Sequence, residues 1–98
     1  PAVARRQLEA LYGPRLVRML LYGSQARGDA EAGSDIDVLV VLNGVVRPGE
    51  EIARTSDIIA SLSLMHGVVL SRAFVSAERF AHEQSPLLIN VRREGIAV

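Results

Sequence analysis

Two aspartates open the most apolar stretch of the chain, and their spacing suggests metal chemistry. Residues 35–42 read DIDVLVVL, which predicts a buried strand. Side chains of a strand alternate between its faces, so Asp35 and Asp37 should project to the same side. Two neighbouring carboxylates repel each other and are costly to desolvate, and a divalent cation offsets both costs. The pair therefore predicts a Mg²⁺ or Mn²⁺ site; the alternative is that Asp35 is a turn residue and Asp37 lies on an exposed edge.

A second candidate element is the Gly23-Ser24 pair, which directly follows the apolar run of residues 15–22. A glycine after a strand lets the backbone approach an anion closely, and the next amides and the Ser24 hydroxyl can donate hydrogen bonds to it. Arg27 follows, and its planar guanidinium could contact a phosphate. Alone, each feature is commonplace. A phosphate-binding turn joined to a carboxylate pair on the next strand predicts a nucleotide site.

Together these residues form a recognisable motif. Gly23-Ser24, ten further residues and then Asp35-x-Asp37 resemble the GS-x10-D-x-D signature of the DNA polymerase beta-like nucleotidyltransferase superfamily. The stretch YGSQARGDAEAGSDIDVLV is similar to that of its minimal, MNT-type members, and the C-terminal SPLLINVRREGIAV also resembles such domains. The resemblance implies an α/β (α+β) fold, with a small mixed sheet and helices packed mainly on one face. It also implies a single minimal nucleotidyltransferase domain over residues 1–98.

The resemblance assigns roles to the motif residues. Gly23 and Ser24 would bind the nucleotide triphosphate, with Arg27 adding positive charge. Asp35 and Asp37 would be both the metal ligands and the catalytic residues. They would hold Mg²⁺ (or Mn²⁺), with ATP as the substrate and pyrophosphate as the leaving group.

One expected feature of the family is missing from this sequence. Its members usually carry a third carboxylate on a neighbouring strand, where it binds the metal and helps to deprotonate the acceptor. The corresponding stretch, residues 68–75, contains no acid. We place Val69 where relatives have aspartate, with Ser71 next on the same face. Glu78 is the nearest acid beyond this strand, and we interpret it as an acid in the first turn of a helix.

The remaining elements follow from local signals. Gly13-Pro14 ends a first helix, and Asn43-Gly44 and Pro48-Gly49 mark a loop. The next helix should present Ile52, Ile59, Leu62 and Met65 on one face and stop at Gly67. Ser76 and Ser85 are predicted N-caps. We expect helices over 2–12, 50–66, 77–82 and 86–94, strands over 15–22, 35–42 and 68–75, and a short edge strand near 96–98.

Composition excludes several classes of protein. Eleven basic residues balance eleven acidic ones, so direct nucleic-acid binding is not expected. The absence of cysteine excludes disulfides and thiolate metal sites. No run reaches the roughly 20 apolar residues of a membrane span, and no signal peptide is evident, so we expect a cytoplasmic protein.

Two functions stay open at this stage. One is a nucleotidyltransferase that moves AMP from ATP onto a hydroxyl of a partner protein or small molecule, as the antitoxin of a toxin-antitoxin pair. Its expected partner is a HEPN-type protein or a further copy of itself. The other is a catalytically impaired relative that serves as a nucleotide- or HEPN-protein-binding module. The sequence does not give the acceptor, the nucleotide base or the oligomeric state.

Overall fold

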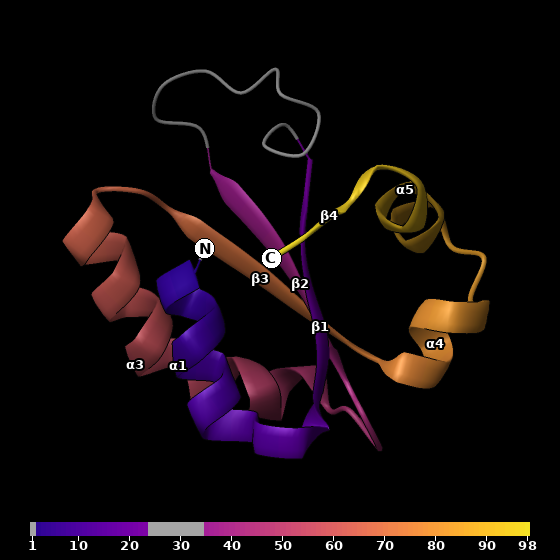
Figure 1. The fold of residues 1–98 in the computed structure, drawn as a ribbon, viewed down its shortest axis with the longest axis horizontal. Coiled ribbons are helices and arrows are strands. Elements are labelled where there is room, and N and C mark those ends of the chain that lie inside the picture. Colours follow the sequence, from indigo (N-terminus) through magenta and orange to yellow (C-terminus); the bar gives the residue numbers. More distant parts are fainter. Residues whose placement is uncertain (1, 24–34) are drawn as a thin grey trace.

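A computed structural model describes residues 2–23 and 35–98, and these form a four-stranded sheet with helices on both of its faces (Figure 1). The elements, in chain order, are α1 (Ala2–Tyr12), a 3-10 turn (Gly13–Arg15), β1 (Leu16–Tyr22), β2 (Ile36–Leu42), α3 (Pro48–His66), β3 (Leu70–Ser76), α4 (Ala77–His82), α5 (Pro86–Glu94) and β4 (Ile96–Ala97).

The sheet is mixed, with strand order β3-β2-β1-β4. Strands β1 and β2 are antiparallel, and β2 pairs in parallel with β3 through the crossover helix α3. Strand β4 adds a short antiparallel edge to β1. Consequently the end of β1 and the starts of β2 and β3 meet at one end of the sheet, which is the upper end in Figure 1.

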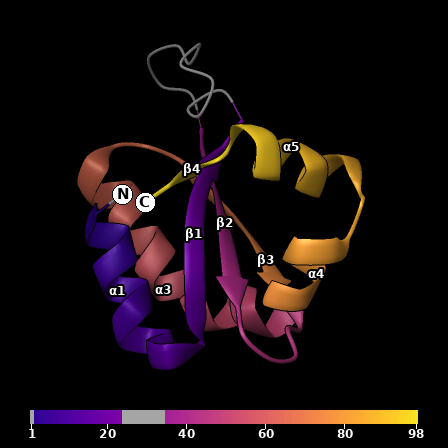
Figure 2. The same cartoon turned by 45° about the vertical axis from the view of Figure 1, so that its right-hand side comes forward.

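Helices cover the two faces unequally (Figure 2). The two longest helices, α1 and α3, pack on one face, where Leu8 and Leu62 join the even-numbered core residues of β2. The shorter α4 and α5 lie on the other face, where Leu88 and Val91 pack against Leu39 and Val41. The predicted α/β fold with helices mainly on one face is confirmed. Asp37 lies on the face of α4 and α5, because that face carries the odd-numbered residues of β2.

The predicted inward face of α3 was wrong. Ile52 and Met65 are exposed, and of the four predicted residues only Leu62 is fully buried. The buried positions of this helix are Glu51, Thr55 and Leu62. Hydropathy could not identify the first two, because partners distant in sequence satisfy their polar groups. The helix also begins earlier than predicted, since Pro48 occupies its first turn instead of the preceding loop.

Glu51 is the centre of a polar cluster that joins α3 to α1. The Tyr12 hydroxyl donates a hydrogen bond of 2.8 Å to Glu51 Oε1, and Arg54 Nη1 lies 3.1 Å from the same oxygen. Arg15 Nη1 is 3.8 Å from Glu51 Oε2. A buried carboxylate is tolerated only when it is paired and hydrogen-bonded in this way. The cluster therefore fixes the start of α3 against the end of α1.

We expect Tyr12→Phe to lower the free energy of unfolding by about 1–2 kcal/mol, because it leaves buried Glu51 short of one donor. Urea denaturation at pH 7 measures the change, and Glu50→Gln on the exposed side of α3 should not move the midpoint. Burial, and then Glu51, raise the pKa of Tyr12 above its usual range. The folded state thus retains this proton more tightly than the unfolded chain, so the stabilisation is present below pH 10 and declines above it. The difference between wild type and Tyr12→Phe should shrink there; a constant difference would contradict this account.

The predicted stop of α3 and the two predicted serine caps are confirmed, unlike the predicted inward face of α3. Gly67 ends α3 in the left-handed conformation, and the hydroxyls of Ser76 and Ser85 accept hydrogen bonds from the backbone amides of Arg79 and Leu88. The expected edge strand is present as β4. Over the residues that the structure describes, no helix is both long and apolar enough to cross a membrane.

Candidate nucleotide and metal site

The candidate site lies at the end of the sheet where β1 ends and β2 and β3 begin. Asp37 on β2 is the register partner of Tyr22 on β1 and of Ser71 on β3. Register partners on adjacent strands point to the same face. The three side chains therefore form a row across the sheet on the face of α4 and α5, with half-buried Asp37 in its centre. We call Tyr22, Asp37 and Ser71 the central row.

Gly23 touches the carboxylate of the central row. Its backbone is left-handed, with φ +72°, and a Cβ built on it would lie 2.6 Å from Asp37 Oδ2. Only glycine combines that conformation with so close an approach. The backbone after β1 thus comes so close to the Asp37 carboxylate that no side chain fits between them. The sequence motif alone suggested a role for Gly23 toward phosphate but did not reveal this contact.

Tyr22 borders Asp37 on the other strand of the hairpin. Burial raises the pKa of the Tyr22 phenol, and the negative charge of Asp37 raises it further. At neutral pH the phenol is consequently protonated and neutral. Its ring also packs against the core beneath α4 and α5.

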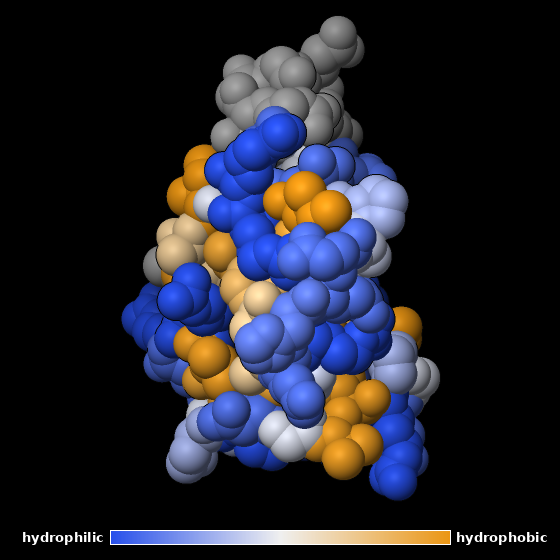
Figure 3. Space-filling view, turned by 90° about the vertical axis from the view of Figure 1, so that its right-hand side faces the viewer, coloured by the Kyte–Doolittle hydropathy of each residue, from blue (hydrophilic) through white to orange (hydrophobic). Residues whose placement is uncertain are grey.

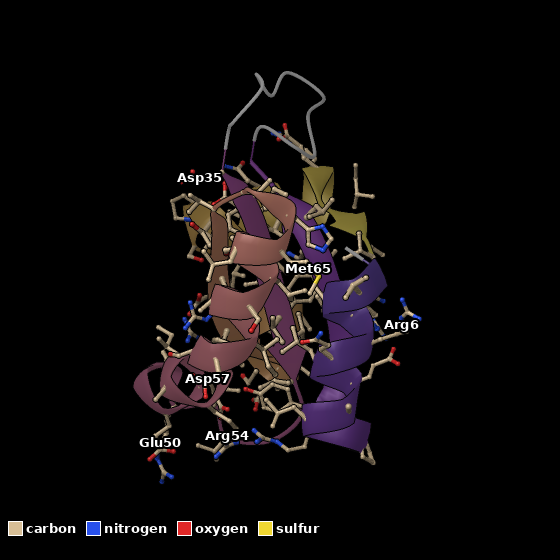
Figure 4. All side chains as sticks on the ribbon, turned by 90° about the vertical axis from the view of Figure 1, so that its left-hand side faces the viewer. Arg6, Asp35, Glu50, Arg54, Asp57 and Met65 are labelled. Atoms are coloured by element: carbon tan, nitrogen blue, oxygen red, sulfur yellow. The ribbon has the colours of Figure 1, made fainter. Side chains whose placement is uncertain are left out.

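Asp35 lies directly before β2 and is exposed to solvent (Figure 4). The Ile36 amide donates a 2.9 Å hydrogen bond to the Val69 carbonyl. Ile36 and Leu70 are register partners in the parallel pair of β2 and β3. The residues before them, Asp35 and Val69, therefore lie beside each other. Val69 is 57% exposed, so an apolar side chain lies open to solvent beside Asp35.

Strand β3 adds no acidic residue to the pair of Asp35 and Asp37. The strand reads LSRAFVS, and the first turn of α4 contains the next acid, Glu78. Glu78 cannot replace a ligand, because Ser76 pairs with Leu42 at the opposite end of β2 from Asp37. Among the described residues, no group of three His, Cys, Asp or Glu side chains could hold a metal ion. The observed donors are two carboxylates, and oxygen donors fit a hard divalent cation that keeps water and phosphate oxygens as its other ligands.

Arg72 fixes the position of β3 relative to the site. Its side chain points to the face opposite Ser71, where Nε donates to Thr55 Oγ1 at 2.9 Å and Nη2 donates to the Ile52 carbonyl at 2.8 Å. Both acceptors belong to α3. The arginine thereby ties the start of β3 to the crossover helix and holds Ser71 in register with Asp37.

An apolar cavity of about 420 Å³ lies directly behind the site, on the other face of the sheet. Its strand residues Leu21, Ile36, Val38 and Leu70 alternate along the chain with the central row. Helix α3 adds Leu62 and His66, and His66 is the only titratable side chain among the described lining residues. Apolar walls offer no partner to a triphosphate, so this cavity is not the nucleotide site. The face with α4 and α5 is largely hydrophilic, with hydrophobic groups in small separate patches (Figure 3).

Two predicted nucleotide-binding residues, Ser24 and Arg27, lie outside the described residues. The structure brings together Gly23 and Asp37, and it sets Asp35 immediately before the strand that carries Asp37. The predicted roles of these five residues toward nucleotide and metal remain predictions.

Comparisons with known proteins agree with this geometry. A family model described as a nucleotidyltransferase domain matches residues 3–94. The chain is 37% identical over 73 residues to the Methanocaldococcus jannaschii protein named "Putative protein adenylyltransferase MJ0604". The aligned region covers 74% of this chain and 67% of that protein. The chain therefore belongs to the nucleotidyltransferase domain family.

Solved structures with low sequence identity share the fold. One, described as a toxin-antitoxin with AMP-PNP, superposes with a TM-score of 0.62 at 19% identity, over 97% of this chain and 69% of that chain. A mutant of the toxin-antitoxin MntA-HpeT gives a TM-score of 0.62 at 16% identity, over 99% of this chain and 71% of that chain. These similarities confirm the nucleotidyltransferase fold.

Proposed function

We propose that this chain is a magnesium-dependent nucleotidyltransferase that transfers AMP from ATP to an acceptor oxygen, and that it acts as the antitoxin of a toxin-antitoxin pair. The family-type acceptor is a hydroxyl of a partner protein or small molecule. The observation that carries the proposal is the contact between left-handed Gly23 and the Asp37 carboxylate. That contact brings the candidate phosphate-binding turn close to the strand of the candidate metal ligand Asp37.

Each residue of the site has a defined task under this proposal. Gly23 and Ser24 bind the triphosphate through backbone amides and a hydroxyl, and Arg27 offsets its charge. Asp35 and Asp37 hold Mg²⁺. The bound metal would neutralise phosphate charge while pyrophosphate leaves. Tyr22 and Ser71 border Asp37 as its register partners on the two neighbouring strands.

The proposed nucleotide and partner draw support from the relatives. The Methanocaldococcus jannaschii relative carries the name of a protein adenylyltransferase, and one structural neighbour is a toxin-antitoxin with AMP-PNP. Both suggest an adenine nucleotide, and the second suggests a protein partner. We infer a HEPN-type toxin as that partner, or a second copy of this chain.

A second candidate function rests on the neutral start of β3. With Val69 and Ser71 beside the two aspartates, the described site lacks the acid that family members use on this strand. A site of this composition could bind nucleotide without turnover. The chain would then act as a nucleotide-sensing or toxin-binding module.

Calorimetric titration of ATP with and without Mg²⁺ tests the proposal, followed by incubation with labelled ATP and the candidate toxin. We expect binding that requires magnesium and label transferred to an acceptor. Magnesium-dependent binding without any transfer would favour the binding module. Lack of ATP binding by the wild-type chain would contradict the transferase and the nucleotide-sensing module, and would leave toxin binding as the function.

A further inference from the structure

The two flanks of Asp37 differ in chemistry. On the β1 side lies Gly23, where the phosphate-binding turn begins. On the β3 side lie Ser71, the register partner of Asp37, and the exposed Val69 beside Asp35. If the nucleotide occupies the Gly23 flank, as proposed above, the β3 flank is the side from which an acceptor reaches the nucleotide.

This acceptor flank offers no base among the described residues. Ser71 is an alcohol and Val69 is apolar, so neither takes up a proton at neutral pH. Tyr22 is a phenol, protonated at neutral pH, and lies on the far side of Asp37. Asp35 and Asp37 are committed to the metal in the proposed function. An alcohol acceptor would therefore have to lose its proton without help from these side chains.

We propose that the preferred acceptor is a phosphate group, whose oxygen is already ionised at neutral pH, and that the neutral Val69–Ser71 flank selects it. The inference rests on the proposed nucleotide transfer and concerns only the acceptor. It favours a phosphate oxygen over the hydroxyl that the family resemblance implies.

The magnitude of base catalysis decides between the two acceptors. A positioned general base contributes typically about 10²–10⁴-fold in rate, and an alcohol loses this factor at a site without one. A phosphate acceptor loses nothing, because it already carries an ionised oxygen at neutral pH, and a phosphate monoester has a second pKa of about 6. A carboxylate on this flank would repel such an acceptor, whereas valine and serine do not.

The proposed step balances without an added base or redox partner. A non-bridging oxygen of the acceptor phosphate attacks the α-phosphorus of ATP and forms a new P–O–P bond. The bond from that phosphorus to the bridging oxygen breaks, and its electron pair leaves with pyrophosphate. The acceptor gives up no proton in forming the bond. With inorganic phosphate as the acceptor, the nucleotide product is ADP.

The acceptor is tested with the full chain, Mg²⁺ and α-labelled ATP, offering inorganic phosphate, glycerol and tyrosine amide at equal concentration. We expect ADP to form at least about a hundredfold faster than either hydroxyl product. The phosphate reaction should be flat from pH 7.5 to 9, whereas a hydroxyl reaction without a base should rise about tenfold per pH unit.

Two variants provide readouts that do not need turnover. Val69→Asp adds a carboxylate at an exposed position beside Asp35, so it should fold normally, and Val69→Asn is its neutral control. We expect Val69→Asp to bind Mn²⁺ about tenfold tighter, as a third oxygen ligand joins the pair. It should also bind phosphate about tenfold more weakly, measured with Mg²⁺ and an ATP analogue carrying a methylene between the α and β phosphorus atoms. Val69→Asn should match wild type in both titrations.

The outcomes separate this inference from the proposed function. Transfer to tyrosine amide or glycerol at the same rate as to phosphate, or faster, would overturn the inference and leave the nucleotidyltransferase intact. Because Asp29 and Glu31 lie outside the described residues, the hydroxyl reaction is repeated with Asp29→Asn/Glu31→Gln. A hydroxyl reaction lost in that variant identifies the base and also overturns the inference. Absence of magnesium-dependent ATP binding would overturn both the inference and the proposed function.

Discussion

Asp37→Asn should abolish the magnesium-dependent part of ATP binding, with a loss of about a hundredfold or more in affinity. Asp37 has Tyr22 and Ser71 as register partners on the two neighbouring strands, and the backbone of Gly23 comes close to its carboxylate. Asparagine retains the shape of this side chain but removes the charge that Mg²⁺ requires. Calorimetric titration of ATP at fixed Mg²⁺ measures the loss. Exposed Asp35 lies outside β2, so Asp35→Asn should cost less, about tenfold.

The change in ATP affinity without Mg²⁺ distinguishes a metal ligand from a residue that only supports the fold. Without Mg²⁺, the two aspartates repel the triphosphate, so Asp37→Asn should bind free ATP as well as wild type or more tightly. Asp57→Asn is the matched control, because Asp57 is exposed on α3, well away from Asp35 (Figure 4). It makes the same charge change and should alter neither titration. Equal losses with and without Mg²⁺ in Asp37→Asn would show that the residue supports the fold and not the metal.

Local signals allowed most of the elements to be predicted from the sequence. Each depends on residues within one turn of the chain: the left-handed Gly67, the Ser76 and Ser85 caps, and the Pro86 that opens α5. The apolar run that predicts β2 likewise needs only the residues of that strand. Such features do not depend on which segments meet in space, so the sequence contains them in full.

The inward face of α3 could not be predicted in the same way. Glu51 and Thr55 appear solvent-facing by residue type, yet Tyr12 and Arg72, which hydrogen-bond to them, lie on other elements. Because of these long-range hydrogen bonds the polar Glu51 and Thr55 are buried, whereas the apolar Ile52 and Met65 are exposed. A periodicity argument fails wherever polar groups are buried with distant partners.

The sequence also could not predict which residues form the central row. Residues 23–35 separate β1 from β2, and a connection of that length does not fix the register as a tight hairpin turn does. The position of Tyr22 beside Asp37 could therefore not be predicted. The parallel register of β3 depends on Arg72 and α3, so the sequence identified the missing acid without placing Ser71 opposite Asp37.

Gly23→Ala should impair the site beyond its effect on folding. The left-handed backbone costs alanine about 1–2 kcal/mol of stability. In addition, the new Cβ would lie 2.6 Å from Asp37 Oδ2, so the carboxylate must move away. We expect magnesium-dependent ATP affinity to fall by at least about tenfold in protein that is still folded, because a candidate metal ligand is displaced. Urea denaturation and calorimetric titration of the same preparation give the two effects separately.

Gly44→Ala isolates the backbone strain from the displacement of Asp37. Gly44 is also left-handed, with φ +83°, but a Cβ there has no neighbour within 4 Å. Both variants therefore carry a similar conformational cost, and only Gly23→Ala places an atom against the carboxylate. We expect comparable losses of stability, with ATP binding preserved in Gly44→Ala. Wild-type ATP binding by folded Gly23→Ala would mean that the Asp37 carboxylate can shift without consequence, and the contact on which the proposed site is built would have no functional role.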